Sequence, residues 1–440
     1  MTASTIADLD TPTSLFLKLR DLQPCFLLES VTHAQEVGRY SFIGLLPVKT
    51  IEYHGDGLLS DLIERELAAL DTSSHGLTAG MVGAIACENV HEFLPTKIER
   101  NGRADQPLAA FVVPGAVVKF DHVSRRITLT HADGEAAANK MMDDIREMMA
   151  LPLPSLKEGR DSSEPVATIS REEFSGMVKR AQEYISAGDI FQVVLSLAFE
   201  GETDLHPYQV YRALRHLNPS PYLCYLDFGK YQIIGSSPEA LIKLDDDGEL
   251  TIRPIAGTRP RGADKAHDLA LEEELKADAK ELAEHNMLVD LARNDIGRVS
   301  EIGSVRVPDL RQVERYSHVM HLCSTVTGQL AKEYTPLQAF MKAFPAGTVS
   351  GAPKIRAMQI IAELEPNPRG FYAGSVGYFT RDGQFDQAIT IRTIIINDGK
   401  YSAQAGAGIV ADSNSDSEYD EITNKAAALL KALEFAKELL

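Results

Sequence analysis

The 440-residue chain has no tryptophan and only four cysteines. Cys25, Cys87, Cys224 and Cys323 form no Cys-x-x-Cys pair. Although His321 lies near Cys323 in the sequence, no second pair is present to complete a zinc site. We therefore expect reduced, buried thiols and no structural zinc.

Long apolar runs and a surplus of positive charge are missing too. Apolar segments such as Leu45–Val48 and Met81–Ala86 are too short to cross a bilayer, and residues 1–10 lack the basic and apolar regions of a signal peptide. The net charge of −19 opposes binding to nucleic acid or anionic lipid. These absences favour a cytoplasmic protein with neither nucleic acid nor membrane as a partner. An anionic small substrate would need local cations or a metal ion.

The order of elements predicts an α+β fold with mainly antiparallel sheets. Residues 151–165 are rich in Pro, Ser, Gly and charge and predict a linker between an N-terminal region, 1–150, and a catalytic region, 166–440. Ser170 and Glu173 form a helix capping box. Further helices are expected at 135–150, 263–293 and 417–440, and strands at 108–119 (interrupted at Pro114-Gly115), 126–130, 191–199, 222–228, 231–234, 370–378 and 385–396.

Two carboxylate pairs have the same spacing. Glu281 and Glu284 share one face of an expected helix, and Glu418 and Glu421 share a face of another. Oxygen ligands of this kind suit magnesium, which usually takes one or two carboxylates and keeps several waters. By spacing alone, ordinary solvated helix faces are an open alternative.

Several longer motifs resemble the chorismate-utilising enzyme family, which comprises anthranilate, aminodeoxychorismate, isochorismate and salicylate synthases. They are Glu281–Asp295, Gly406-Ala407-Gly408 and Glu418–Lys425, and the resemblance extends from about Ser170 to the C-terminus. It implies two packed, mainly antiparallel sheets flanked by helices.

The resemblance also implies a site. Glu284 and Glu421 would hold Mg²⁺, with Glu281 and Glu418 close by, and the metal would polarise bound chorismate. Arg392 matches the arginine that binds the substrate's side-chain carboxylate. The other substrate-binding residues that it implies are Gly257, Thr258, Tyr372, Gly406, Ala407, Gly408 and Lys425.

Within this family, two positions indicate whether water, a lysine side chain or ammonia attacks the ring. Water-using members carry a lysine base where this chain has Gln192, which cannot activate water. Aminodeoxychorismate synthases typically carry a nucleophilic lysine where this chain has Ala256. Ammonia attack at C2, giving anthranilate and pyruvate, is therefore expected. Glu239 matches the general acid for the leaving hydroxyl, and His321 the active-site histidine.

The resemblance implies that ammonia comes from a separate glutamine amidotransferase subunit, since this chain contains no Gly-x-Cys-x-Gly elbow. Two segments resemble the family's site for feedback inhibition by L-tryptophan, and the residues concerned are Glu29, Ser30, Pro221, Tyr222 and Leu223. Two alternatives stay open: an aminodeoxychorismate synthase, and a catalytically silent regulatory subunit of the same fold.

Overall fold

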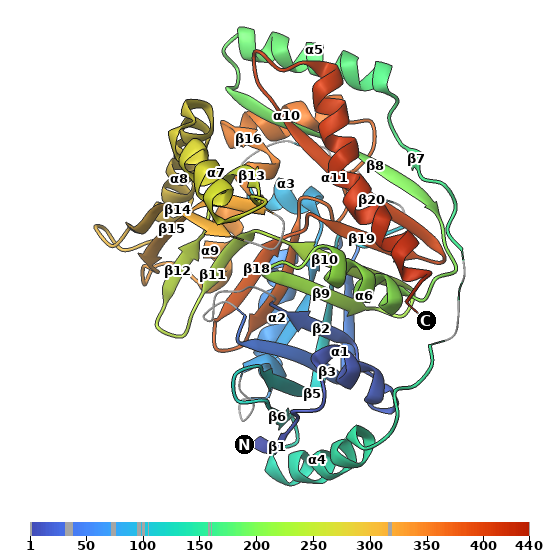
Figure 1. The fold of residues 1–440 in the computed structure, drawn as a ribbon. Coiled ribbons are helices and arrows are strands. Elements are labelled where there is room, and N and C mark those ends of the chain that lie inside the picture. The colour runs from blue at the N-terminus through green and yellow to red at the C-terminus, as the bar shows by residue number, and fades with distance from the viewer. Residues whose placement is uncertain are drawn as a thin grey trace.

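The computed structural model describes residues 2–30, 38–71, 76–94, 98, 102–103, 105–156, 159, 161–315 and 319–439 (Figure 1). All pairings between the named strands of these residues are antiparallel, and helices flank them, so the predicted α+β class is confirmed.

Two branches of sheet leave a shared ribbon made of β3 (Tyr40–Tyr53) and β5 (Ala109–Asp121). The first branch continues from β3 through β2 (Phe26–Glu29), β9 (Tyr222–Asp227), β10 (Tyr231–Ser237), β19 (Thr393–Asn397), β20 (Lys400–Ile409) and β8 (Gln192–Glu202). Short pairings extend it at both ends, with β6 (Arg126–His131) and β1 (Thr2–Ile6) beyond β5, and β7 (Val166–Ala167) and β16 (Gly351–Ala352) beside β8.

The second branch leaves the other end of β5. It runs through β4 (Gly80–Ile85), β17 (Ser375–Thr380), β18 (Phe385–Ile389), β11 (Ala240–Leu244), β12 (Glu249–Ile252) and β15 (Val319–Gln329), and β15 also pairs with β13 (Ile255–Pro260) and β14 (Arg306–Arg315). The predicted interruption of the 108–119 strand is wrong. β5 runs through Pro114, and the register shift falls in the partner strand, between Pro47 and Lys49.

The chain crosses between the branches at two adjacent strand breaks. Pro238-Glu239 separates β10 from β11, and residues 390–392 separate β18 from β19. Backbone hydrogen bonds join the breaks: Ile389 N–H donates to the Glu239 carbonyl and Ser236 N–H to the Arg392 carbonyl, each at 3.0 Å. The continuous strand predicted at 385–396 is therefore wrong, because Arg392 has a left-handed backbone with φ 52°.

Helices cover the sheets (Figure 1). They are α1 (Pro12–Lys18), α2 (Leu59–Ala68), α3 (Val90–Phe93), α4 (Glu135–Met149), α5 (Arg171–Ser186), α6 (Pro207–Leu217), α7 (Lys265–Ala277), α8 (Ala279–Gly297), α9 (Pro336–Ala343), α10 (Lys354–Leu364) and α11 (Ser415–Ala436). The Ser170–Glu173 capping box begins α5 as predicted. No helix in the described part of the chain has the length and apolar character needed to span a bilayer.

The long helix predicted at 263–293 is instead two helices. Asp278 ends α7 in an extended conformation, and its carboxylate accepts hydrogen bonds from the backbone N–H groups of Lys280 and Glu281 to begin α8. The strand predicted from Gly370 starts later, at Ser375, because Gly370 and Ala373 both have φ of 60°.

Strands of the first 150 residues pair directly with later strands, as β2 does with β9 and β4 with β17. Buried side chains from both parts form shared clusters. The division into regions 1–150, 151–165 and 166–440 stays a prediction. The four cysteines are free and buried, as expected.

Candidate active site

The two strand breaks open on a cavity of about 260 Å³, called here the catalytic cavity. It is walled by β8, β13, β20, α8 and α11. Its lining includes nine of the residues predicted for the site: Gln192, Glu239, Thr258, Glu284, His321, Tyr372, Arg392, Gly406 and Lys425. Segments more than 200 residues apart in sequence therefore meet at one place.

Glu239 is almost fully buried in this wall. Burial raises the pKa of its carboxyl group from the ordinary 4.5 to about 8, while the nearby Thr348 hydroxyl opposes that shift. The side chain is therefore protonated at neutral pH. A neutral carboxylic acid facing a cavity is the form required of a proton donor.

One wall of the cavity is made by β8 and β20. Side chains of β20 alternate, so that Gln404, Gly406 and Gly408 share one face while Ala407 is buried on the other, in the core. A Cβ on Gly406 would lie 2.7 Å from the Tyr372 hydroxyl, and one on Gly408 would lie 2.3 Å from Nε2 of Gln192. A side chain at Gly406 would therefore press on Tyr372 and on the Leu195 carbonyl, whereas one at Gly408 would displace the end of the Gln192 side chain.

The opposite wall contains a bulge in β13 at Gly257, which has φ 76° and lies where the pairing with β15 shifts register. The bulge turns Thr258 toward His321, whose Nδ1 lies 2.9 Å from the Thr258 hydroxyl and 3.4 Å from the Gly257 carbonyl. Burial lowers the pKa of His321, so its imidazole is neutral at pH 7. Ala256 also lines the cavity and places no amine there.

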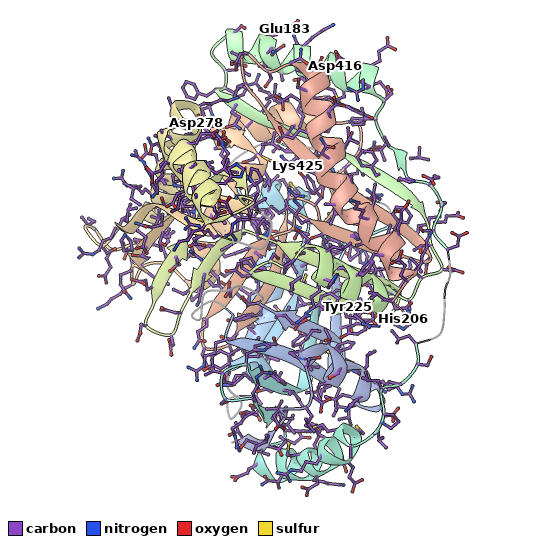
Figure 2. All side chains as sticks on the ribbon, viewed as in Figure 1. Glu183, His206, Tyr225, Asp278, Asp416 and Lys425 are labelled. Atoms are coloured by element: carbon purple, nitrogen blue, oxygen red, sulfur yellow. The ribbon has the colours of Figure 1, made fainter. Side chains whose placement is uncertain are left out.

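Two cations stand at the boundary between the cavity and α11. Burial lowers the pKa of Arg392, whose guanidinium donates to the Lys425 carbonyl at 3.3 Å. The Lys425 ammonium donates to the Gly406 carbonyl at 3.0 Å and pairs with Glu421 at 2.5 Å. Figure 2 labels Lys425 on α11. Arg392 and Lys425 also line a neighbouring hollow that contains Glu421.

The four predicted carboxylates come together from α8 and α11. Partial desolvation raises the pKa of Glu284, and the charges of Glu281 and Glu421 raise it further. Desolvation likewise raises the pKa of Glu418, with Glu421 adding to the effect. Glu281 is already paired with Arg259, 3.1 Å away. Glu421 is likewise paired with Lys425, so Glu284 and Glu418 are the two members of the group without an ion pair to another described residue.

Comparison with known proteins identifies the family of the chain. Residues 23–431 match the family model described as chorismate binding enzyme. The chain belongs to the chorismate-binding enzyme family. The match begins at residue 23. The sequence motifs had indicated a later start of the resemblance, at about Ser170.

Relatives within the chorismate-binding family are similar over nearly their full length. Anthranilate synthase component 1 of Thermus thermophilus is 46% identical, with 98% of this chain and 97% of that protein covered. The Acetivibrio thermocellus protein of the same name is 42% identical over 100% of this chain and 96% of its own. The crystal structure of anthranilate synthase component I from Streptococcus pneumoniae TIGR4 superposes with a TM-score of 0.81 at 35% identity, covering 97% and 98% of the two chains.

The carboxylates of this family member fit a hard divalent cation. All are oxygen donors. Desolvation, with a smaller contribution from neighbouring carboxylates, raises the pKa of Glu284 and of Glu418, and a bound cation would offset both effects. In the described residues, no group of three or more His, Cys, Asp or Glu side chains is close enough to hold a metal ion. Magnesium sites commonly use one or two carboxylates, completed by water and substrate oxygens, so the two observations are compatible.

The two segments predicted to bind tryptophan are also neighbours. Pairing of β2 with β9 places Glu29 opposite Leu223, and the same antiparallel register brings the next residue, Ser30, next to Tyr222 at the start of β9. Glu29 is buried, accepts from the Tyr211 hydroxyl at 2.5 Å and pairs with Arg215 at 2.9 Å. The hydroxyl of Ser30 is buried, with no hydrogen-bond partner among the described residues.

Five cavity residues escaped the sequence motifs: Thr348, Val349, Gln404, Ala405 and Leu429. Gln404 shares the period-two face of Gly406 and Gly408, and that alternation is the signal by which it could have been found. Thr348 lies in a short turn without a pattern of its own. Only the tertiary fold brings it to Glu239.

Proposed function

We propose that the chain catalyses the conversion of chorismate and ammonia to anthranilate and pyruvate, a lyase reaction dependent on magnesium. The observation that carries this proposal is the pair Gln192 and Ala256. Both line the catalytic cavity together with the neutral acid Glu239. Glu239 thus offers a proton to a leaving group, while position 192 has no lysine base for water and position 256 no lysine nucleophile.

Each side chain then has a role that its position supports. Arg392 binds a substrate carboxylate, and Tyr372 and Gly406 shape the wall against which the ring lies. Glu239 donates its proton to the departing 4-hydroxyl, and the neutral His321 is placed to accept a proton during aromatisation. When Mg²⁺ is bound by Glu284 and Glu421, it neutralises the ring carboxylate and withdraws electron density from the ring.

Product identification tests the proposal directly. Purified protein is incubated with chorismate, MgCl₂ and an ammonium salt, and the products are separated and identified by fluorescence and mass. We expect anthranilate and pyruvate in equal amounts. Aminodeoxychorismate would show instead that Ala256 does not decide the product, and unchanged chorismate would identify a silent subunit. A glutamine amidotransferase partner is proposed as the source of ammonia, so adding the partner and glutamine should replace the salt.

We further propose that tryptophan inhibits the enzyme at the junction of β2 and β9. The support is the adjacency of Ser30 to Tyr222, together with the unpartnered Ser30 hydroxyl and the unpartnered Oε1 of Glu29. The Glu29 carboxylate oxygen can accept a hydrogen bond from the ammonium group of an amino acid, and the Ser30 hydroxyl can donate to its carboxylate or accept from its ammonium group.

Ser30→Ala is expected to weaken inhibition by tryptophan while sparing the uninhibited rate. Loss of one hydrogen bond predicts an inhibition constant higher by roughly five- to tenfold. The measurement is anthranilate formation against tryptophan concentration. Ser124→Ala, at an exposed turn, is the control and should behave as wild type. An unchanged inhibition constant in Ser30→Ala would reject this site.

A further inference from the structure

An ion pair is buried where α8, α9 and α10 meet. The Lys354 ammonium lies 2.9 Å from the Asp295 carboxylate, and both side chains are shielded from solvent. Burial disfavours both charges, because it lowers the pKa of Lys354 and raises the pKa of Asp295, and each partner opposes the shift of the other. The desolvation penalty of a buried pair can exceed its Coulombic attraction, so a gain in stability does not explain why the pair is here.

The place of Lys354 in its helix is unusual for a cation. It is the first residue of α10, and the helix dipole favours anions at that end. The side chain reaches the last residue of α9, so that the ammonium donates to the Ala343 carbonyl at 2.9 Å. Carbonyls at a helix C-terminus have no partner within the helix and carry partial negative charge, which suits a cation. One ammonium group therefore joins α8, α9 and the start of α10.

The same ammonium closes a loop. Residues 344–353 run from the end of α9 to the start of α10, and the contact of the ammonium with the α9 carbonyl holds the two ends of this loop together. Thr348 and Val349, near the middle of the loop, line the catalytic cavity. The Thr348 hydroxyl is the group near Glu239 that opposes the rise in its pKa. The position of the loop thus sets the surroundings of the proposed general acid.

The 344–353 loop also contacts two elements that carry other residues of the site. Its β16 segment pairs with β8, and Ala352 lies opposite Gln192. On the side of α8, a Cβ added to Gly347 would lie 1.7 Å from a side-chain atom of Leu291, so the loop and the helix are packed with no space between them. A shift of the loop would therefore reach both Gln192 and α8.

The ion pair holds the face of α8 that carries a proposed metal ligand. Asp295 lies eleven residues after Glu284, close to three helical turns, so the two carboxylates share one face of the helix. Glu284 lines the catalytic cavity from that face. Oδ1 of Asp295 has no partner in the described part of the chain, where the hydrogen bond from Lys354 to Oδ2 holds the carboxylate.

We infer that Lys354 is a positioning residue for the reaction, whose ammonium holds the 344–353 loop beside Glu239 and holds α8 with Glu284 facing the cavity. Lys354 is not part of the cavity lining, so it acts through the backbone that it fixes. The inference rests on the proposed function for the roles of Glu239 and Glu284. The contacts of Lys354 with the loop and the helix do not depend on that function.

The test compares Lys354→Met with the double variant Lys354→Met/Asp295→Asn. The single variant leaves a carboxylate buried without its partner and should have a lower Tm, whereas the double variant removes that charge and should keep a Tm near wild type. In the double variant, kcat for anthranilate formation should fall by about tenfold to a hundredfold, the effect of a small misplacement of reacting groups. The KM for chorismate should stay near wild type, because Arg392 and Tyr372 lie outside α8 and the loop.

Two further measurements separate positioning from a general loss of structure. Because the Thr348 hydroxyl opposes the raised pKa of Glu239, its withdrawal should move the descending limb of kcat/KM to higher pH. Hydrogen exchange followed by mass spectrometry should show the amides of residues 344–353 exchanging at least about tenfold faster, the effect of losing a hydrogen bond from a charged donor. The exchange measurement needs no turnover, so its result does not depend on the proposed function.

Lys18→Met/Asp10→Asn is the matched control. Lys18 has the same two kinds of partner, because its ammonium lies 2.9 Å from the Asp10 carboxylate and donates at 2.6 Å to the carbonyl of Met149, the last residue of α4. None of these three residues lines the catalytic cavity. The control should leave kcat, the pH profile and the exchange of residues 344–353 unchanged.

Wild-type kcat and wild-type exchange in the folded double variant would overturn the inference. A lower kcat with an unchanged pH profile and unchanged exchange of the loop would overturn it too, because the pair would then act elsewhere. If the double variant does not fold, Asp295→Asn takes its place. That variant keeps a polar group beside Lys354, so the same changes are expected at a smaller size, and their absence would reject the role of Lys354. If wild type makes no anthranilate, the proposed function fails, and the exchange rates alone decide whether Lys354 holds the loop.

Discussion

Glu421→Gln is expected to lower kcat by at least about a thousandfold at limiting magnesium. The substitution keeps the shape of the side chain but removes the charge with which α11 would hold the cation. A Lewis-acid contact contributes several kcal/mol to the transition state, and each step of about 1.4 kcal/mol is a factor of ten in rate. The substitution also removes the ion pair between residue 421 and Lys425. The Lys425 ammonium keeps its hydrogen bond to the Gly406 carbonyl.

The measurement is the rate of anthranilate formation against magnesium concentration, with Mn²⁺ binding in the presence of chorismate as a readout independent of turnover. Glu434→Gln is the matched control, because Glu434 is an exposed glutamate nearer the C-terminal end of α11. It should leave both quantities unchanged. A Glu421→Gln enzyme with a near-wild-type rate at limiting magnesium would mean that the metal is bound elsewhere or not required.

The sequence predicted those parts of the site whose residues are close together in the chain, and did not predict contacts between distant segments. Helical spacing predicted that Glu281 and Glu284 share a helix face. It predicted the same for Glu418 and Glu421, because residues three apart in a helix are close through local geometry alone. That the two faces meet was implied only by the resemblance to a family. The structure brings them together through sheet pairings between segments distant in sequence, which no local pattern encodes.

The errors in the predicted elements have the same origin. An apolar run such as 385–396 predicts one strand, yet the chain breaks at Arg392 to pass from one branch of sheet to the other. The break is stabilised by hydrogen bonds with the second break at Glu239. Glu239 and Arg392, two of the proposed functional side chains, thus lie at the two places where tertiary structure overrides local strand preference.

Glu239→Gln is expected to lower kcat by roughly a hundredfold to ten-thousandfold, the usual contribution of a general acid. Glutamine fills the same space but has no acidic proton. In wild type, the pKa of about 8 means that the free enzyme holds this proton at neutral pH. Its kcat/KM should therefore be level below pH 8 and fall about tenfold per pH unit above it. The variant should lose this descending limb, which a defect in folding alone would not remove.

Stability measurements separate loss of the acid from damage to the fold. Because burial raises the pKa of Glu239 from 4.5 to about 8, the native state binds more protons than the unfolded state between these values. The free energy of unfolding of wild type therefore contains a component that is fully present below pH 4.5 and is lost as pH rises through 8. Glutamine does not titrate, so the variant's Tm should decline less than that of wild type between pH 5 and about 8.5. An inactive variant that is also less stable than wild type at pH 8.5 would indicate that Glu239 supports the packing of the strand break rather than proton transfer.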